Sequence, residues 1–425
     1  MGDHQRRHRG GGGGFGEDRI SGLPDALLHE ILVRLRSASA AARTSVLSRR
    51  WRHLWAHLPE LRLVALPSRE AAPASFIDTV DAALGGYLAP TLEHLGVSHH
   101  VTDIQGRDLR ISPARIAPWL HFAAAHVVGE LNLYLRVPQT FGASTPEIVW
   151  DEEAAVLELP VCERTKRIEL FLQYAYTHWL RPQASGLFAV LTFLKINGYV
   201  RMEGRDLTAL VSTQCPCLRD LDLFLKLIDN FDVLIHTNSL HTLVLRVLET
   251  RRLEVVAPRL EELTIYDQPK EAHISAPKLA KVAWHAAYDP HINRFVDVGR
   301  TLQLLRTSKQ ASSLTKRFNE VDELDLNISM YFPDVATYES FLIQTNKLPK
   351  CKSFRLLLSW EHHALVPIVL HLLRSCSGTK KFQVHLYGPL SRRVMHSCLP
   401  SCPCRLDESR KVDVIDLSSL EESLK

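Results

Sequence analysis

The spacing of apolar residues changes at Leu23, where a helical pattern begins. The apolar positions recur at intervals of three and four residues: Leu27, Leu28, Ile31, Leu32 and Leu35. This recurrence predicts an amphipathic helix over about residues 24–36. Pro24 suits the first turn of that helix, because its fixed φ is already helical and the N–H that it lacks has no partner there.

Two further short helices are predicted before residue 60. An alanine-rich stretch over residues 38–43 predicts the second, and Ser48 is suited to cap the third, which Pro59 ends. Large apolar side chains recur at helical spacing in this third helix: Trp51, Leu54, Trp55 and Leu58. A module this small cannot bury all of them, so the surplus predicts a docking face for another protein. Packing on the rest of this chain stays open as the alternative.

Beyond residue 61 the template L-x-x-L-x-L recurs along the chain. Clean copies begin at Leu218, Leu240 and Leu260, which, with a looser copy at Leu279, are 22, 20 and 19 residues apart. That interval is typical of leucine-rich repeats. The looser copies are Val128/Leu131/Leu133, Thr165/Ile168/Leu170, Leu191/Leu194/Ile196, Leu279/Val282/Trp284, Val321/Leu324/Leu326, Cys351/Phe354/Leu356 and Thr379/Phe382/Val384. The gap from residue 279 to 321 has room for one more degenerate copy.

Each copy predicts a short strand followed by a turn and a return segment. One such unit cannot bury its apolar face alone, but stacked neighbours can. We therefore expect an α/β fold in which a three-helix module precedes an irregular solenoid with parallel strands on its concave face. The recurring Ala-Pro-x-Leu phrase at Pro258 and Pro277 supports this arrangement. The copies are weakest over residues 292–425, where an unrelated α/β domain stays open.

Two helical candidates, over residues 76–95 and 111–122, precede the first strand copy. We expect them to cap the solenoid and to join it rigidly to the N-terminal helices, because a loose hinge would blunt the positioning of a partner. The expected organisation is a disordered Gly- and Arg-rich tail over residues 1–17, the helical module over 18–60, the junction and cap over 61–127, the repeats over 128–390 and a closing segment over 391–425.

The helical module resembles an F-box over about residues 18–60. Residues 23–35 are similar to the opening of that motif and residues 43–55 to its close, in the family's order and spacing. The resemblance implies docking onto a Skp-family adaptor, which in turn binds a cullin scaffold. The residues on motif positions, divided between adaptor contacts and internal packing, are Leu23, Pro24, Leu27, Leu28, Ile31, Leu32, Val46, Leu47, Trp51, Leu54 and Trp55. Trp51 is the expected anchor, because a large aromatic side chain buries much area at little entropy cost.

The closing segment resembles the start of the FBD module, which often ends plant-type F-box/leucine-rich-repeat proteins. The similar residues are Cys398, Cys402 and Cys404, followed by an acidic, leucine-containing stretch over residues 412–422. The sequence ends at Lys425, so we expect this module to be incomplete. Together with His396 the cysteines also suggest zinc, but C-x3-C-x-C is not the spacing of a common zinc site, and we expect no metal.

Composition and charge narrow the function classes. A net charge of +4 is too small to predict a nucleic-acid-binding face, and no apolar run approaches the length of a membrane span. The N-terminus lacks the pattern of a signal peptide, and the eight cysteines follow no secreted framework, so we expect the cytoplasm, the nucleus or both. The chain contains no nucleophile elbow, phosphate loop or H-E-x-x-H motif, so we expect no catalytic residues and no cofactor.

These features predict a non-catalytic substrate-recognition subunit of a Skp-cullin-F-box ubiquitin ligase whose repeats bind a target protein. Residues between the leucines of the clean copies are the expected contacts: Arg219, Asp222, His241, Val244, Glu261 and Thr264. Their mixed chemistry favours a protein over a phosphate-rich target. The alternatives are a leucine-rich-repeat scaffold acting outside a ubiquitin ligase and an enzyme within residues 292–425, which would need a deep polar pocket with perturbed titratable groups.

Overall fold

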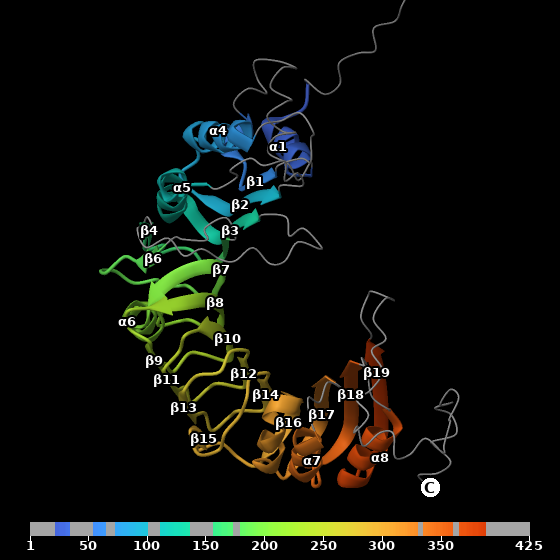
Figure 1. Cartoon of the computed structure of the whole chain (residues 1–425). Helices are drawn as coiled ribbons and strands as arrows, with labels where there is room; N and C mark the ends of the chain where they lie inside the picture. Colours follow the sequence, from blue (N-terminus) through green and yellow to red (C-terminus); the bar gives the residue numbers. More distant parts are fainter. Residues whose placement is uncertain are drawn as a thin grey trace, which may run out of the picture.

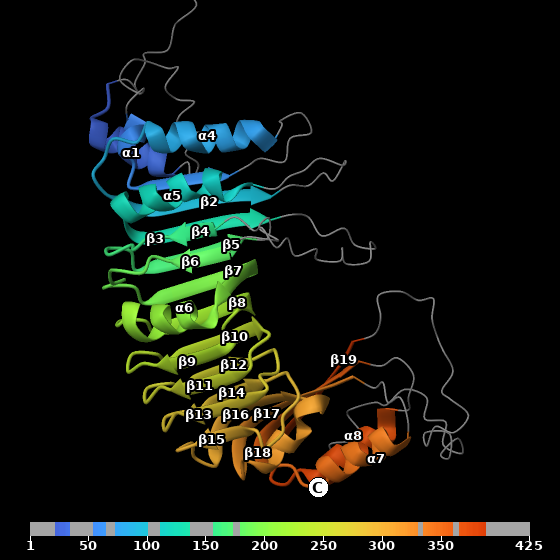
Figure 2. The same cartoon turned by 60° about the vertical axis from the view of Figure 1, so that its left-hand side comes forward.

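The computed structural model describes residues 22–34, 54–64, 73–100, 111–136, 156–172, 179–329, 335–359 and 365–387. These residues form an arc, with the N-terminal helical module at one end (Figure 1). A fifteen-stranded sheet, here the main sheet, lines the inner side of the arc. Helices and a second sheet of four strands lie on its outer side (Figure 2).

The main sheet is parallel throughout, and its path runs in the order β1-β2-β3-β5-β7-β8-β10-β12-β14-β16-β17-β18-β19. Off this path, β6 pairs with β7, and β4 pairs with β6. Its strands are β1 (Glu60–Val64), β2 (Leu92–His100), β3 (Val127–Arg136), β4 (Val156–Leu159), β5 (Arg167–Leu172), β6 (Trp179–Pro182), β7 (Phe193–Glu203), β8 (Asp220–Ile228), β10 (Thr242–Leu248), β12 (Glu262–Ile265), β14 (Lys281–Trp284), β16 (Thr301–Ser308), β17 (Glu320–Ser329), β18 (Lys350–Ser359) and β19 (Lys381–Tyr387).

The predicted fold class is confirmed. Every copy of the leucine template found in the sequence coincides with a strand of the main sheet, and β16 occupies the gap where an additional degenerate copy was expected. Strands β16 to β19 continue the same sheet in register, so the described part of residues 292–387 is not an unrelated α/β domain. Stacking explains this, because each strand covers the open edge of its predecessor.

The main sheet begins earlier than residue 128, where the repeats were expected to start. Strands β1 and β2 already belong to it, and both follow the template, as Leu58-x-x-Leu61-x-Leu63 and Leu92-x-x-Leu95-x-Val97. The helix expected over residues 76–95 is correspondingly too long: α4 (Pro73–Gly85) ends before the strand copy. The other candidate helix is α5 (Pro113–His126). Residues 61–127 therefore contribute both helices and strands.

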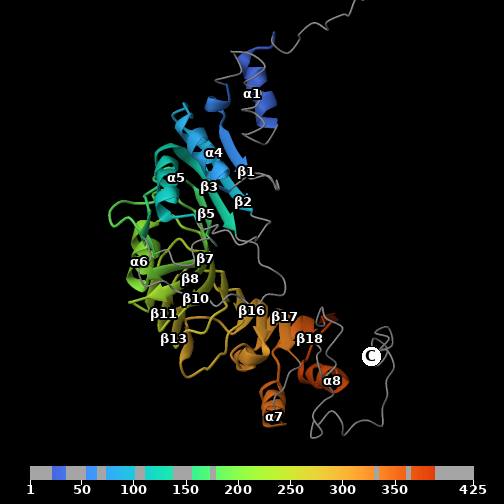
Figure 3. The same cartoon turned by 45° about the horizontal axis from the view of Figure 1, so that its top comes forward.

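The length of each repeat determines what lies on the outer side. In the region of the clean copies the return segments are short strands, and they pair into the second sheet in the order β15-β13-β11-β9. These strands are β9 (Asp232–His236), β11 (Arg252–Val256), β13 (Glu271–Ser275) and β15 (Asn293–Val296). Longer repeats hold helices instead: α6 (Gly204–Ala209), α7 (Val335–Gln344) and α8 (Leu365–Ser375), the last two near the end of the arc (Figure 3).

The Ala-Pro-x-Leu phrases form the turn that leads from an outer strand into the next inner strand. The N–H of Leu260 donates to the carbonyl oxygen of Ala257 over 3.0 Å, and that of Leu279 donates to Ala276 over 3.1 Å. Proline suits the second position of such a turn because its φ is already near −65°. The repeated turn keeps successive strands in the same register, so the template leucines lie buried between the two sheets.

Candidate partner-binding surfaces

Helix α1 (Asp25–Arg34) carries the first half of the predicted docking motif. Leu28 and Leu32 are 0% and 1% exposed, and they pack with Leu54 and Leu58 from the end of the module. Leu23 and Trp55 pack against the edge of this cluster. These motif residues therefore form the module's own core, and burial of each leucine is worth about 2 kcal/mol.

Leu27 and Ile31 lie one turn apart on a neighbouring face of α1, which is turned away from the buried cluster. They are 45% and 39% exposed, and Pro24 at the start of the helix is exposed as well. Large aliphatic side chains left in solvent on a helix face are typical of a protein-binding surface. Val46, Leu47 and Trp51, the other predicted motif residues, lie outside the described residues.

Direct hydrogen bonds connect the helical module to the arc. The N–H of Leu88 donates to the carbonyl oxygen of Ala56 over 2.9 Å, and the N–H of Glu93 donates to that of Pro59 over 2.8 Å. The hydroxyl of Tyr87 donates to the carbonyl oxygen of Leu58 over 3.0 Å. Burial raises the pKa of Tyr87 to about 12, so this hydroxyl remains a donor across the physiological pH range. The contacts join the end of the module to the loop before β2.

The concave face of the main sheet presents side chains in rows, because its strands pair in register. The first row holds the residues at the start of each strand, Asp220, Thr242 and Glu262 on β8, β10 and β12. The second row, two residues farther along, contains Asp222, Val244 and Thr264. The structure thus brings together three of the six predicted contact residues. The other three, Arg219, His241 and Glu261, precede their strands and follow one another along the sheet edge, where backbone hydrogen bonds of 2.7 and 2.9 Å link them.

Farther along the second row, two arginines enclose a buried carboxylate. Arg306 donates to Asp325 over 3.0 Å, and Arg355 donates to both carboxylate oxygens over 3.1 and 2.9 Å. The side chain of Asp325 is only 3% exposed, whereas those of Arg306 and Arg355 are 46% and 35% exposed. The three residues come from β16, β17 and β18, so the triad fastens three consecutive repeats together.

A third row lies two residues beyond the second, and reasoning from the template missed it. It holds Phe224, Arg246, Tyr266 and His285. The guanidinium carbon of Arg246 lies 5.2 Å from the ring centroid of Phe224 and 4.1 Å from that of Tyr266. Tyr266 stacks on His285, with ring centroids 4.6 Å apart and planes 9° apart. Extending the alternation of each copy by one step would have found this row, because every second residue of a strand points to the same face.

Comparisons with known proteins agree with this geometry. Residues 20–63 match the F-box domain family model. An F-box/FBD/LRR-repeat protein of Arabidopsis thaliana is 45% identical over 150 residues, 34% of this chain and 32% of that protein. The chain is thus similar to plant F-box/leucine-rich-repeat proteins. An FBD-associated F-box protein of the same plant is 26% identical over 249 residues, 59% of this chain and 50% of that protein.

A third relative, F-box/LRR-repeat protein 13 of Arabidopsis thaliana, is 27% identical over 276 residues, 63% of this chain and 56% of that protein. The matched regions therefore span between 32% and 56% of the lengths of these relatives. F-box domains generally bind Skp1-type adaptors, and F-box/leucine-rich-repeat proteins are generally non-catalytic substrate adaptors. The FBD-like segment over residues 391–425 lies outside the described residues.

An open polar depression of about 540 Å³ occupies the F-box end of the concave face. Acids and bases alternate in its lining, which consists of Glu60, Arg62, Glu93, His94, Gly129, Glu130, Lys166, Arg167, Thr192, Phe193 and Asp220. His94 lies 3.4 Å from Glu130, and burial, with Arg62 nearby, lowers the pKa of His94. The depression is wide and its charges are largely paired, so it suits a protein surface better than a small molecule.

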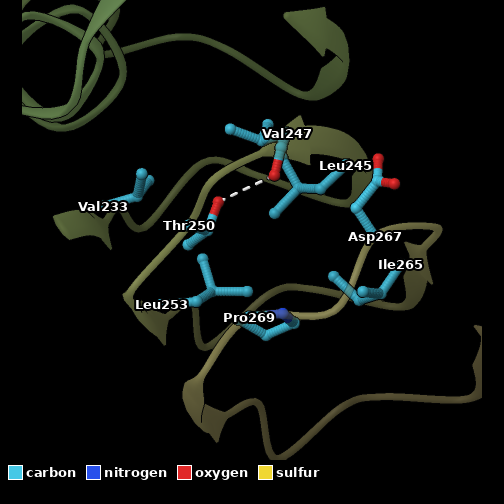
Figure 4. Close-up of a pocket in the computed structure, with 8 residues that line it drawn as sticks. All are labelled: Val233, Leu245, Val247, Thr250, Leu253, Ile265, Asp267 and Pro269. Carbon is cyan, nitrogen blue, oxygen red and sulfur yellow. Dashed lines mark hydrogen bonds between the residues drawn. The ribbon is translucent and has the colours of Figure 1, made fainter. Parts of the chain in front are cut away.

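A small pocket lies between the two sheets (Figure 4), with a volume of about 10 Å³. Its lining is mostly aliphatic, and Thr250 donates to the carbonyl oxygen of Val247 over 2.9 Å. Burial raises the pKa of Asp267 at its edge. A cavity of this size has room for about one water molecule and none for a cofactor.

Metal-ligating side chains do not gather in the described part of the chain, where no group of three or more His, Cys, Asp or Glu could hold an ion. The cysteine set proposed for zinc, Cys398, Cys402 and Cys404 with His396, lies outside that part. Among the described helices, none has the length and apolar character needed to cross a membrane.

Proposed function

We propose that the chain is the substrate-recognition subunit of a Skp-cullin-F-box ubiquitin ligase. The exposed Leu27 and Ile31 of α1 would dock onto the Skp-family adaptor, together with Val46, Leu47 and Trp51 of the motif. The concave face would hold a target protein. The chain itself would be non-catalytic and would raise the effective concentration of the target at the transfer site.

One observation carries this proposal: the F-box divides its apolar residues between a buried cluster and an exposed face, and the end of the module is hydrogen-bonded to the arc. A fixed connection would keep a bound target at a defined distance from the adaptor, which favours productive transfer. We also propose that the protein acts in the cytoplasm or nucleus. The free thiols of Cys162, Cys215, Cys217, Cys351 and Cys376 fit a reducing compartment.

The test is co-purification of the full chain with a plant Skp1-type adaptor. We expect a stable complex at micromolar concentration that Leu27→Asp weakens at least tenfold, because the charge would be buried on docking. Leu187→Asp is the matched control, since Leu187 is a 51% exposed leucine outside the F-box. A wild-type chain that binds no adaptor would contradict the ligase role and favour a leucine-rich-repeat scaffold acting outside a ligase.

A further inference from the structure

Arg246 stands out on the concave face because it packs against two aromatic rings. Its guanidinium lies over Tyr266 at 4.1 Å and near Phe224 at 5.2 Å. Within the described residues, no carboxylate oxygen forms a salt bridge with Arg246. A guanidinium that lies over an aromatic face has its N–H groups in its own plane, where they can donate two parallel hydrogen bonds to a ligand.

Charged side chains of the second row form salt bridges with one another. Lys195 pairs with Asp222 over 2.7 Å, and Arg306 and Arg355 both donate to Asp325. Asp267 is the nearest acid in sequence to the third row. Burial raises its pKa, and the charge of Arg246 lowers it to a smaller extent, but the two side chains form no salt bridge. Arg246 is therefore a cation of the third row that forms no salt bridge within the described residues, and Asp267 acts on it only at longer range.

Aromatic and aliphatic side chains lie beside Arg246. Tyr266 is 37% exposed and stacks on His285, and Val244 and Thr264 of the second row lie beside them. A ligand carboxylate bound by Arg246 would thus have an aromatic and aliphatic surface next to it. An aromatic or large aliphatic side chain adjacent to the acid would cover that surface.

We propose that the third row binds an acidic peptide segment of the target, with an Asp or Glu carboxylate on Arg246 and a neighbouring aromatic or aliphatic side chain on Tyr266 and His285. This inference rests on the proposed role of the concave face and names the class of target. A carboxylate fits better than a phosphate, because one free guanidinium balances a single negative charge.

The experiment is selection from a random-peptide display library on the full chain in complex with its adaptor. We expect enrichment of sequences with Asp or Glu next to an aromatic or large aliphatic residue. Replacing that acid by its amide should weaken binding about tenfold or more, the effect of losing a charge-assisted bidentate pair. Arg246→Gln should remove the enrichment, and Arg246→Lys should restore part of it.

Arg252→Gln is the matched control, because Arg252 is exposed on the outer sheet and pairs with Glu254. Adaptor binding measured on the same Arg246→Gln sample separates the two proposals, since it should be unchanged. Three results would overturn the inference: enriched peptides without acids, enrichment that survives Arg246→Gln, or no enrichment on a chain that binds its adaptor. A phosphoserine peptide that binds through Arg246 more tightly than its glutamate counterpart would overturn the choice of carboxylate.

Discussion

Leu27 and Leu28 are consecutive residues of α1 that differ sharply in burial: Leu27 is 45% exposed, and Leu28 is completely buried. Sequence similarity places both on the F-box motif without distinguishing their roles. The structure distinguishes these roles, because Leu28 belongs to the buried cluster with Leu32, Leu54 and Leu58 and Leu27 does not. One leucine stabilises the module, and its neighbour is available to a partner.

Leu28→Ala should therefore destabilise the F-box by about 2–5 kcal/mol, the usual cost of a cavity at a buried leucine. Leu27→Ala should change its stability by less than about 0.5 kcal/mol, because an exposed side chain leaves no cavity. Hydrogen exchange resolved to peptides measures this locally. We expect faster exchange over residues 25–34 in Leu28→Ala only, and equal exchange in the two variants would contradict the assignment of the buried cluster.

The triad of Arg306, Asp325 and Arg355 predicts that removing the two arginines destabilises the protein more than removing the aspartate. Replacing both Arg306 and Arg355 by Met leaves a nearly fully buried carboxylate without these partners. We expect the free energy of unfolding to fall by about 3–5 kcal/mol. Asp325→Ala leaves two arginines that are partly exposed and can be hydrated, so its cost should be smaller, about 1–3 kcal/mol.

Urea denaturation of the two variants beside the wild type measures this difference. Lys352→Met is a suitable control, since Lys352 is an exposed cation of the same strand as Arg355 and pairs with an exposed Asp322. Lys352→Met should change the free energy of unfolding by less than about 0.5 kcal/mol. If Asp325→Ala proved as costly as the double arginine variant, the burial of the carboxylate would not be the deciding factor.

Gly204 opens α6 at a point where two backbone segments meet. A Cβ there would overlap the carbonyl oxygens of Asp232 and Asn230, and the N–H of Gly204 donates to Asn230 over 2.7 Å. We expect Gly204→Ala to lower the free energy of unfolding by about 1–3 kcal/mol despite the better helix propensity of alanine, because backbone cannot move aside cheaply. Gly299→Ala is the control, since no atom lies within 4 Å of its Cβ. Equal denaturation midpoints would rule out the close approach.

Cys376 should be the reactive member of a thiol pair. Its Sγ lies 3.0 Å from that of Cys351, and the hydrogen bond from Cys351 lowers the pKa of Cys376 to about 7 while the pKa of Cys351 rises. Only the thiolate is alkylated, so a lower pKa means reaction at lower pH. The rate of Cys376 with iodoacetamide should rise up to about pH 7 and level off above it.

Burial raises the pKa values of Cys162 and Cys215 to about 12, so mass spectrometry should find them unmodified under the same conditions. Cys351→Ala removes the donor, and the pH at which Cys376 reacts should then move upward toward the ordinary thiol value. Reaction of Cys376 that is independent of both pH and Cys351 would exclude the pairing.

Local patterns of the sequence were sufficient for the architecture. A template such as Leu218-x-x-Leu221-x-Leu223 predicts a strand because each strand buries every second side chain, and this requirement is the same in every repeat. The copies at Leu58 and Leu92 carry the same information. The first copy overlaps the third predicted helix of the F-box, and the second begins within the helix predicted over residues 76–95. Both were therefore assigned to helices and not to strands.

The sequence by itself determined that the chain has an F-box helix and a stack of parallel strands, since hydrophobic periodicity and turn chemistry act over a few residues. Only the tertiary structure decided which leucine of α1 faces outward, because the answer depends on Leu54 and Leu58 folding back onto it. It also decided that Arg246 lies between the rings of Phe224 and Tyr266. These residues are far apart in the chain, and the register of the stacked strands brings them together.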